Sequence, residues 1–427
     1  MSGDWRRRDS SVTAARSDGA VQWRVVILGF LVVVLDGFDG VTLGLVIPTL
    51  VSEWRIDAAA FTLPLVIANI GLVIGYSSSG WASARVGRRR VILSGTALFA
   101  VGSAWTAVIT TLPPLSMARL LTGVGLGIIV PPVTSLAADN GPSHRRETIT
   151  VLVSLGLAVG PTIAGVTAGS LMSAYGWESV LWVGAALPAL LMPFLWWGMR
   201  EPAESARGRP ERGQAAVRNL FVVSLRPVTL RLWAISLLVV TTISVITTWA
   251  PVLATDYGLR PTEAPLAIAA FGLGGMLGGS VLVLLTTRFP AATVIVATAG
   301  LGAGLLLVAA RVPLSHVGLL IALAGIGMCL IASINGLMAV AMSRYPGPLR
   351  TTGVGWVIAL GRIGGIIGPA YGGALAATRI PAQDIVLATC VIMSIAALLN
   401  LMLALHIRGR AEPCDRSSAS VRDSDLS

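Results

Sequence analysis

The sequence has no lysine and little charge of either sign. All 31 basic residues are Arg, acidic residues number 20, and charged residues make up 12% of the 427 residues. A soluble domain carries about a quarter charged residues. This shortage argues against a soluble enzyme with a large core. It indicates a chain whose surroundings are mostly apolar, and 55% of its residues are hydrophobic.

Cysteine and histidine are also scarce, and neither forms a pattern that binds metal. The three cysteines have no ligand spacing, and the three histidines lie far apart in the sequence. The Gly-rich stretches lack the Walker pattern and follow no predicted strand. We therefore expect no metal, no cofactor and no catalytic residues. A membrane enzyme would need a nucleophile or a metal cluster at one depth, and we find none.

Long apolar runs recur along nearly the whole chain. A helix needs about 20 apolar residues to cross a bilayer core roughly 30 Å thick. Twelve segments meet this requirement, which predicts an all-α membrane protein with twelve transmembrane helices. The segments are 25–47, 60–82, 91–111, 114–138, 149–173, 178–198, 230–254, 264–286, 291–310, 315–341, 352–377 and 384–406.

The positions of the Arg residues predict the orientation. The net charge of +11 would suit nucleic-acid binding, but most of the Arg lie in alternate loops, as membrane topology requires. Four lie on the opposite side: Arg55, Arg260, Arg311 and Arg379. We therefore expect a multi-pass protein of the cell (inner) membrane with both termini in the cytoplasm, and no nucleic-acid partner.

Composition divides the chain into five parts. The predicted parts are a cytoplasmic arm (1–24), a six-helix half (25–199), a polar cytoplasmic linker (200–229), a second six-helix half (230–407) and a disordered tail (408–427). The two halves resemble each other. Gly156-x3-Gly160-Pro161 in the fifth span matches Gly364-x3-Gly368-Pro369 in the eleventh. This pattern predicts a duplicated unit, as in two-fold-related transporters.

Four charged residues lie inside predicted spans and away from the span ends: Asp36, Asp39, Arg119 and Arg362. A buried charge costs at least ~2.5–3.5 kcal/mol on insertion scales, so each indicates a function or a pairing. Asp36 and Asp39 share one helix face. Two close carboxylates resist ionising together, so one is expected to hold a proton, as a proton carrier requires.

Depth brings Asp39 and Arg119 together. At ~1.5 Å per residue, Asp39 lies about 9 Å and Arg119 about 8 Å below the same outer membrane edge. Their pairing would offset the cost of burial. The pair is either an inert structural link or a functional link that substrate or protons break and remake. Arg362, beside Gly361 and Gly364, either grips a substrate carboxylate or braces its helix.

The loop after the second span carries a recognisable pattern. It reads Gly80-x3-Ala84-Arg85-Val86-Gly87-Arg88-Arg89 and resembles the signature Gly-x3-Asp-Arg-x-Gly-Arg-Arg of the major facilitator superfamily. Asp36-Gly37-Phe38-Asp39 resembles the first-helix motif of that superfamily's aromatic-acid:proton symporters. Other matches are Arg119 with Gly123, Gly125 and Gly127, then Pro131 and Asp139, and Gly361-Arg362-x-Gly364-x3-Gly368-Pro369.

The resemblance implies a monomeric carrier that imports a small aromatic carboxylic acid with protons by alternating access. It assigns proton coupling to Asp36 and Asp39 and substrate binding to Arg119. Arg362 and the aromatic residues Phe38, Trp249 and Tyr371 are further candidates for the substrate site. Gly80, Arg85, Gly87 and Arg88 would form the gating loop.

Two departures from the family pattern concern this loop. The carboxylate of the loop signature is replaced by Ala84, and its counterpart in the second half is Thr287. Both losses weaken the case for ordinary gating. Gly156-x3-Gly160-Pro161-x3-Gly165 also resembles the signature of drug:proton antiporters. Export of a drug or metabolite by the same fold therefore stays open as the alternative function.

Overall fold

The computed structural model describes residues 22–140, 146–199, 220–221, 225–378 and 380–409. Within these residues it contains helices and turns and no strand, and twelve helices are long and apolar enough to cross a membrane. Both expectations from the sequence are therefore confirmed. Most of the predicted arm, most of the predicted linker and nearly all of the predicted tail lie outside the described residues.

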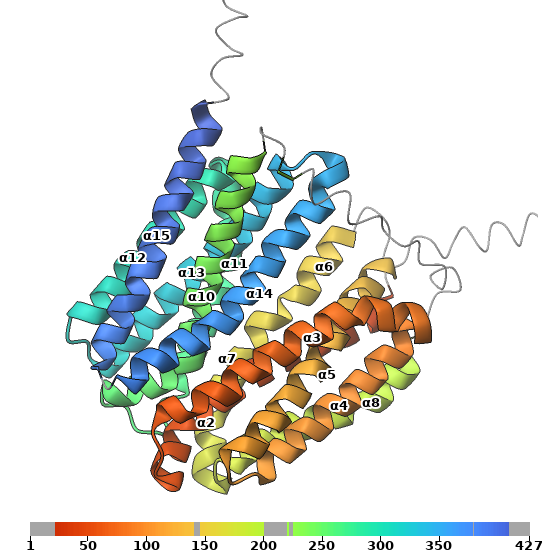
Figure 1. The fold of residues 1–427 in the computed structure, drawn as a ribbon, viewed down its shortest axis with the longest axis vertical. Helices are drawn as coiled ribbons and strands as arrows, with labels where there is room; N and C mark the ends of the chain where they lie inside the picture. The colour runs from red at the N-terminus through yellow and green to blue at the C-terminus, as the bar shows by residue number, and fades with distance from the viewer. Residues whose placement is uncertain (1–21, 141–145, 200–219, 222–224, 379, 410–427) are drawn as a thin grey trace, which may run out of the picture. The chain divides into compact units, whose positions relative to one another are not determined.

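The chain forms two compact units (Figure 1). The first comprises Met1–Ile56 and Leu63–Arg209, and the second comprises Asp57–Thr62 and Pro210–Ser427. The helices of the first unit are α2 (Trp23–Trp54), α3 (Thr62–Val86), α4 (Arg88–Val108), α5 (Leu112–Asp139), α6 (Arg146–Ser154), α7 (Gly156–Tyr175) and α8 (Glu178–Gly198). Those of the second are η2 (Ala58–Phe61), α10 (Arg226–Asp256), α11 (Leu266–Arg288), α12 (Ala291–Arg311), α13 (His316–Arg344), α14 (Gly347–Ala377) and α15 (Ala382–Gly409).

Two of the differences from the predicted boundaries have a local cause. The predicted linker 200–229 ends too late, because α10 already begins at Arg226. Pro227 explains this start, since proline suits the first helical turn, where its missing N–H would have no partner within the helix. The predicted span 149–173 is divided into α6 and α7 by a turn at Leu155, next to Gly156.

Glycines set the helix packing in the first unit. A Cβ at Gly160 of α7 would collide with the backbone of Val34 and Phe38 in α2. Gly123 and Gly127 of α5 approach the backbone of α3 equally closely. Small residues of this kind let transmembrane helices pack backbone to backbone.

The second unit repeats both contacts. Gly364 and Gly368 of α14 pack against the backbone of α10, as Gly156 and Gly160 of α7 pack against α2. Gly274 and Gly278 of α11, with Gly327 of α13, bring α11 and α13 together, as the glycines of α3 and α5 do in the first unit. The glycine pattern that suggested a duplicated unit therefore corresponds to the same helix contacts in both units.

Two neighbouring glycines in α11 test this packing. A Cβ at Gly278 would collide with the carbonyl oxygen of Met328, whereas a Cβ at Gly279 meets no atom within 4 Å. We expect Gly278→Ala to lower the free energy of unfolding by about 1–3 kcal/mol because it overpacks the interface. Gly279→Ala should leave it unchanged or slightly raised. The apparent unfolding temperature of the purified protein measures both, and equal effects of the two variants would contradict the packing argument.

Candidate functional site

A buried ion pair joins α2 and α5 in the first unit. Arg119 Nη1 donates to Asp39 Oδ1 at 3.0 Å, and Arg119 Nη2 donates to Asp39 Oδ2 at 3.1 Å. Nη2 also donates to the backbone carbonyl oxygen of Asp39 at 3.2 Å. The Asp39 and Arg119 side chains are 6% and 4% exposed. The contact expected from the depth of the two residues is therefore present, as a bidentate ion pair.

The carboxylate of Asp39 is fully engaged in the pair, whereas one N–H group of Arg119 is not. The carboxylate of Asp39 accepts from both terminal nitrogens of Arg119, which is the strong, planar form of this interaction. Arg119 Nε is buried and has no hydrogen-bond acceptor among the described residues. Because this N–H is unused, the guanidinium can donate a hydrogen bond to a further anionic or polar group while it still holds Asp39.

The four residues Asp36 to Asp39 reach different neighbours because successive helical residues are rotated by about 100°. Gly37 lies against Leu157 and Pro161 of α7, where a Cβ would clash. Phe38 is 2% exposed and contacts Gly184 of α8. Asp39 reaches α5. Asp36, one turn earlier in α2, is as buried as Asp39, since each residue as a whole is 4% exposed.

The three aromatic candidates have different surroundings. Phe38 and Trp249 are almost fully buried, each inside its own unit. The Trp249 indole N–H donates to the carbonyl oxygen of Pro369 at 3.2 Å, and the ring packs over Gly372, which ties α10 to α14. These contacts favour a packing role for both rings. Tyr371 is half-buried, so it keeps accessible surface.

Arg362 is half-buried on α14. Its neighbours Gly361 and Gly364 pack against α10, at Ser236 and Val240 and at Leu237 and Thr241, respectively. The glycines around Arg362 therefore have a packing function of their own.

The predicted gating loop is a tight turn between α3 and α4. Gly87 has a φ of +91°, which favours glycine, and Gly80 has open space around it. Arg88 pairs with Asp139 at the end of α5 at 2.6 Å, a contact that the sequence analysis did not predict. The sequence offered one signal for this pair, since both helix ends are predicted to lie on the same side of the membrane.

The two positions that depart from the family signature lack an anionic group. Ala84 is exposed and contributes a methyl group. The Thr287 hydroxyl donates to the carbonyl oxygen of Leu284 in its own helix at 2.6 Å. Arg85 instead lies over the Trp81 ring, with its guanidinium carbon 4.4 Å from the ring centre.

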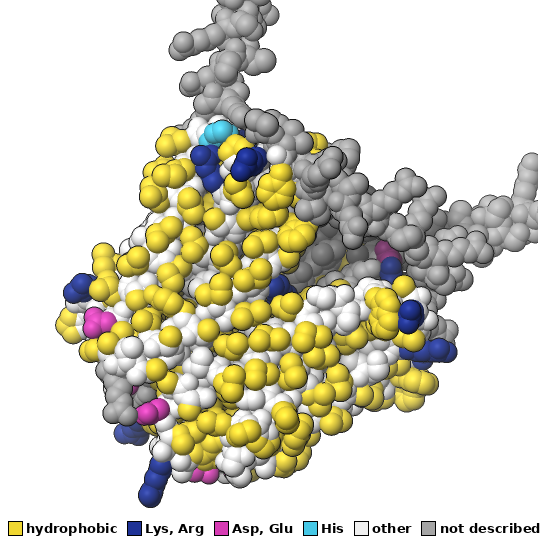
Figure 2. Space-filling view, viewed as in Figure 1, with side chains coloured by type: hydrophobic (Ala, Val, Ile, Leu, Met, Phe, Trp, Pro, Cys, Tyr) yellow, Lys and Arg dark blue, Asp and Glu magenta, His cyan; other side chains and the backbone are white. Residues whose placement is uncertain are grey.

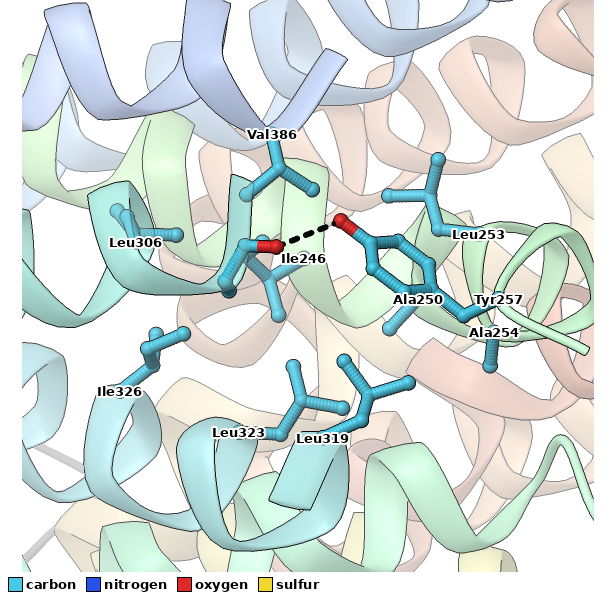
Figure 3. A pocket seen from close by; sticks show the side chains of 11 residues that line it. Ile246, Ala250, Leu253, Ala254, Tyr257, Leu306, Leu319, Leu323, Ile326 and Val386 are labelled. Atoms are coloured by element: carbon cyan, nitrogen blue, oxygen red, sulfur yellow. Dashed lines mark hydrogen bonds between the residues drawn. The ribbon is translucent and has the colours of Figure 1, made fainter. Parts of the chain in front are cut away.

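An apolar cavity lies inside the second unit, between α10, α12, α13 and α15 (Figure 3). Its volume of about 20 Å³ is close to what a single water needs. The hydroxyl of Tyr257 in its wall donates to the carbonyl oxygen of Ala309 at 2.8 Å. The cavity is too small for an aromatic ring, no arginine lines it, and it includes none of the candidate site residues.

Comparisons with known proteins agree on one family. The family model described as Major Facilitator Superfamily matches residues 29–369 and 232–423. A gallate transporter of Pseudomonas putida is 30% identical and aligns over 93% of this chain and 95% of its own length. The 3-(3-hydroxy-phenyl)propionate transporter of Escherichia coli is 29% identical over 91% of this chain and 95% of its own length.

A further sequence relative, the 4-hydroxybenzoate transporter PcaK of Pseudomonas aeruginosa, is 29% identical over 83% of this chain and 86% of its own length. Solved structures show the same fold at lower identity. A D-xylose-proton symporter structure matches with a TM-score of 0.74 at 15% identity, covering 90% of this chain and 97% of that one. A bacterial homologue of the lysosomal transporter Spinster, in an inward-facing conformation, also has a TM-score of 0.74, at 18% identity.

The energetic coupling between Asp39 and Arg119 is measurable. Asp39→Leu leaves a buried guanidinium without its anion, which costs about 3–5 kcal/mol, and Arg119→Met leaves a buried carboxylate at similar cost. The double variant removes both charges and should be more stable than either single variant. Unfolding midpoints of the three purified variants and the parent test this. A double variant as unstable as the sum of both singles would show that the two residues are not coupled.

Proposed function

Because this chain belongs to the Major Facilitator Superfamily, we propose that it imports a small aromatic carboxylic acid of the benzoate or hydroxybenzoate type together with protons. The names of its relatives support an aromatic acid as substrate: gallate, 4-hydroxybenzoate and 3-(3-hydroxyphenyl)propionate all combine a ring with a carboxylate. The chain is a transporter and a multi-pass membrane protein. Location in the inner membrane, cytoplasmic termini and a monomeric state are parts of the proposal.

The observation that carries the proposal is the buried pair of Asp39 and Arg119. Arg119 holds a carboxylate in the two-pronged geometry that a substrate carboxylate would use. Asp39 thus occupies the position of the substrate anion. Its spare Nε donor gives Arg119 a first contact for the incoming acid before Asp39 leaves.

Proton coupling follows from an exchange of partners. A proton that binds the Asp39 carboxylate removes its charge and weakens its hold on Arg119. The guanidinium, which stays charged, then takes the substrate carboxylate. When the proton leaves, Asp39 regains its charge and displaces the substrate. One proton and one carboxylate enter together, so the buried site holds one negative charge per guanidinium throughout. Asp36, one turn away and equally buried, is the second group that can carry the proton.

Contacts with the ring belong to other residues. Phe38 and Trp249 are used in helix packing, so Tyr371 is the aromatic candidate with accessible surface. Arg362 is the second candidate for the carboxylate. Neither assignment is needed for the exchange at Arg119.

The alternative is export of a drug or metabolite by the same fold. The glycines that suggested an antiporter, Gly156 and Gly160, are used to pack α7 against α2. This packing accounts for the pattern without assigning a transport direction. A buried arginine also disfavours the cationic substrates of many drug exporters, which supports an anionic substrate.

The substrate and the coupling can be tested together in proteoliposomes. We expect an inward proton gradient to drive accumulation of at least one radiolabelled acid among benzoate, 4-hydroxybenzoate, gallate and 3-(3-hydroxyphenyl)propionate. An uncoupler should abolish the accumulation, because the proton supplies the driving force. Accumulation that survives the uncoupler would argue against symport. Folded protein that moves none of these acids inward would favour export.

Asp39→Asn separates proton coupling from substrate exchange. Asparagine keeps a polar group next to Arg119 but cannot gain or lose a proton, so gradient-driven accumulation should fall to background. Exchange of labelled for unlabelled substrate across the membrane should persist. The matched control is Asp384→Asn, an exposed carboxylate at the start of α15, which should accumulate substrate at the parent rate. Undiminished accumulation by Asp39→Asn would eliminate the proposed proton role.

A further inference from the structure

The turn between α3 and α4, with the end of α8, forms a cationic corner of the first unit. Four arginines lie here: Arg85, Arg88, Arg89 and Arg90. Two of them hold the helices together. Arg88 pairs with Asp139 of α5 at 2.6 Å, and Arg89 donates to the carbonyl oxygen of Trp196 in α8 while its guanidinium carbon lies 4.8 Å from the Trp196 ring centre. Helix packing therefore accounts for Arg88 and Arg89.

Helix packing does not account for Arg85 and Arg90, which are exposed on either side of the turn at Gly87. The guanidinium of Arg85 lies on the face of Trp81, 4.4 Å from the ring centre. The cation–π contact orients this guanidinium and leaves its charge uncompensated. Among the described residues, the carboxylate that pairs with this cluster is Asp139, and Arg88 occupies it. Within the described part of the chain, Arg85 and Arg90 thus give this corner a net positive charge.

Large apolar side chains surround these charges. Trp81 is 62% exposed, Val86 49%, Trp196 57% and Trp197 74%. Tryptophan beside arginine is typical of the depth at which lipid headgroups meet the hydrocarbon core, because the ring is apolar at one end and polar at the other. Figure 2 shows the broad apolar surface of the spans, with most of the arginine side chains at its margins.

We propose that this corner binds the headgroup of an anionic phospholipid. Arg85 and Arg90 supply the positive charge for the phosphodiester, and the exposed faces of Trp81 and Val86 lie along the first part of an acyl chain. A soluble phosphate would interact with the charges but would gain nothing from the exposed apolar side chains around them, so the surface fits a lipid. Juxtamembrane arginines of this kind are attracted to anionic lipids.

Ala84 contributes to this site by what it lacks. It is exposed next to Arg85, at the position where the family signature has a carboxylate. A carboxylate there would place a negative charge beside this cluster and repel a lipid phosphate. The corresponding turn of the second unit offers one exposed arginine, Arg288, beside Phe289. Arg288 is therefore a matched control, since it is an exposed arginine at the end of a span without the cluster.

The test counts lipids on the full-length purified protein by native mass spectrometry, with phosphatidylglycerol or phosphatidylcholine added. We expect the parent to retain phosphatidylglycerol in preference to phosphatidylcholine. Near a membrane surface each arginine contributes roughly 1 kcal/mol, which is about fivefold in affinity, so Arg85→Gln/Arg90→Gln should weaken phosphatidylglycerol binding about 25-fold. Ala84→Asp should weaken it as well. Arg288→Gln should bind as the parent does.

Three results would overturn the proposal. The first is equal retention of phosphatidylglycerol and phosphatidylcholine by the parent. The second is an equal loss in Arg288→Gln and in the double variant, which would show general charge attraction in place of a site. The third is displacement of the lipid by millimolar glycerol phosphate, which would show a site for soluble anions. Unfolding temperatures near that of the parent establish that the variants are folded. The site lies in the first unit and does not depend on which substrate is transported.

Discussion

The absence of water from the bilayer core is the constraint on which this structure depends. A charge placed there needs an opposite charge within the protein, and Asp39 and Arg119 meet this need for each other across α2 and α5. Three successive residues make the contact possible: Gly37 lets α7 approach α2, Phe38 fills the space toward α8, and Asp39 is then left facing α5. Under the proposed mechanism, a proton on Asp39 removes this charge. The pair that the fold requires would then also be the pair that transport uses.

Backbone-to-backbone packing limits which parts of the structure could move in the proposed exchange of partners at Arg119. The glycine contacts of α2 with α7 and of α3 with α5 recur in the second unit, between α10 and α14 and between α11 and α13. Such interfaces have little free space, so each unit resists internal rearrangement. A change of partner at Arg119 must then occur mainly through side chains. The buried Nε donor makes this feasible, because the guanidinium can gain a second anion before it releases the first.

Hydropathy and helix geometry were sufficient to predict the spans and the pair of Asp39 and Arg119. The twelve spans appear as long, mostly apolar runs, and the depth of both charged residues is set by the rise per residue. The burial of Trp249 was not predictable, because an aromatic residue in a span can face lipid, a cavity or another helix with the same hydropathy. The pair of Arg88 and Asp139 depends on how α4 and α5 are staggered, which loop length alone does not fix. The turn at Leu155 leaves no mark in an apolar run.

Surroundings, more than residue type, determine what each arginine does here. Arg119 is 3% exposed, so its charge must be matched by an opposite charge within the protein, and Asp39 supplies it. Arg88 is partly exposed and its pair with Asp139 ties helix ends together. Arg85 lies farther out, where water screens its charge and the nearest partner is the face of Trp81. A carboxylate at position 84 would lower the net positive charge around Arg85. The alanine at that position leaves the charge of Arg85 available to a group outside the protein. Because exposed tryptophans lie beside Arg85, we expect that group to be a lipid headgroup.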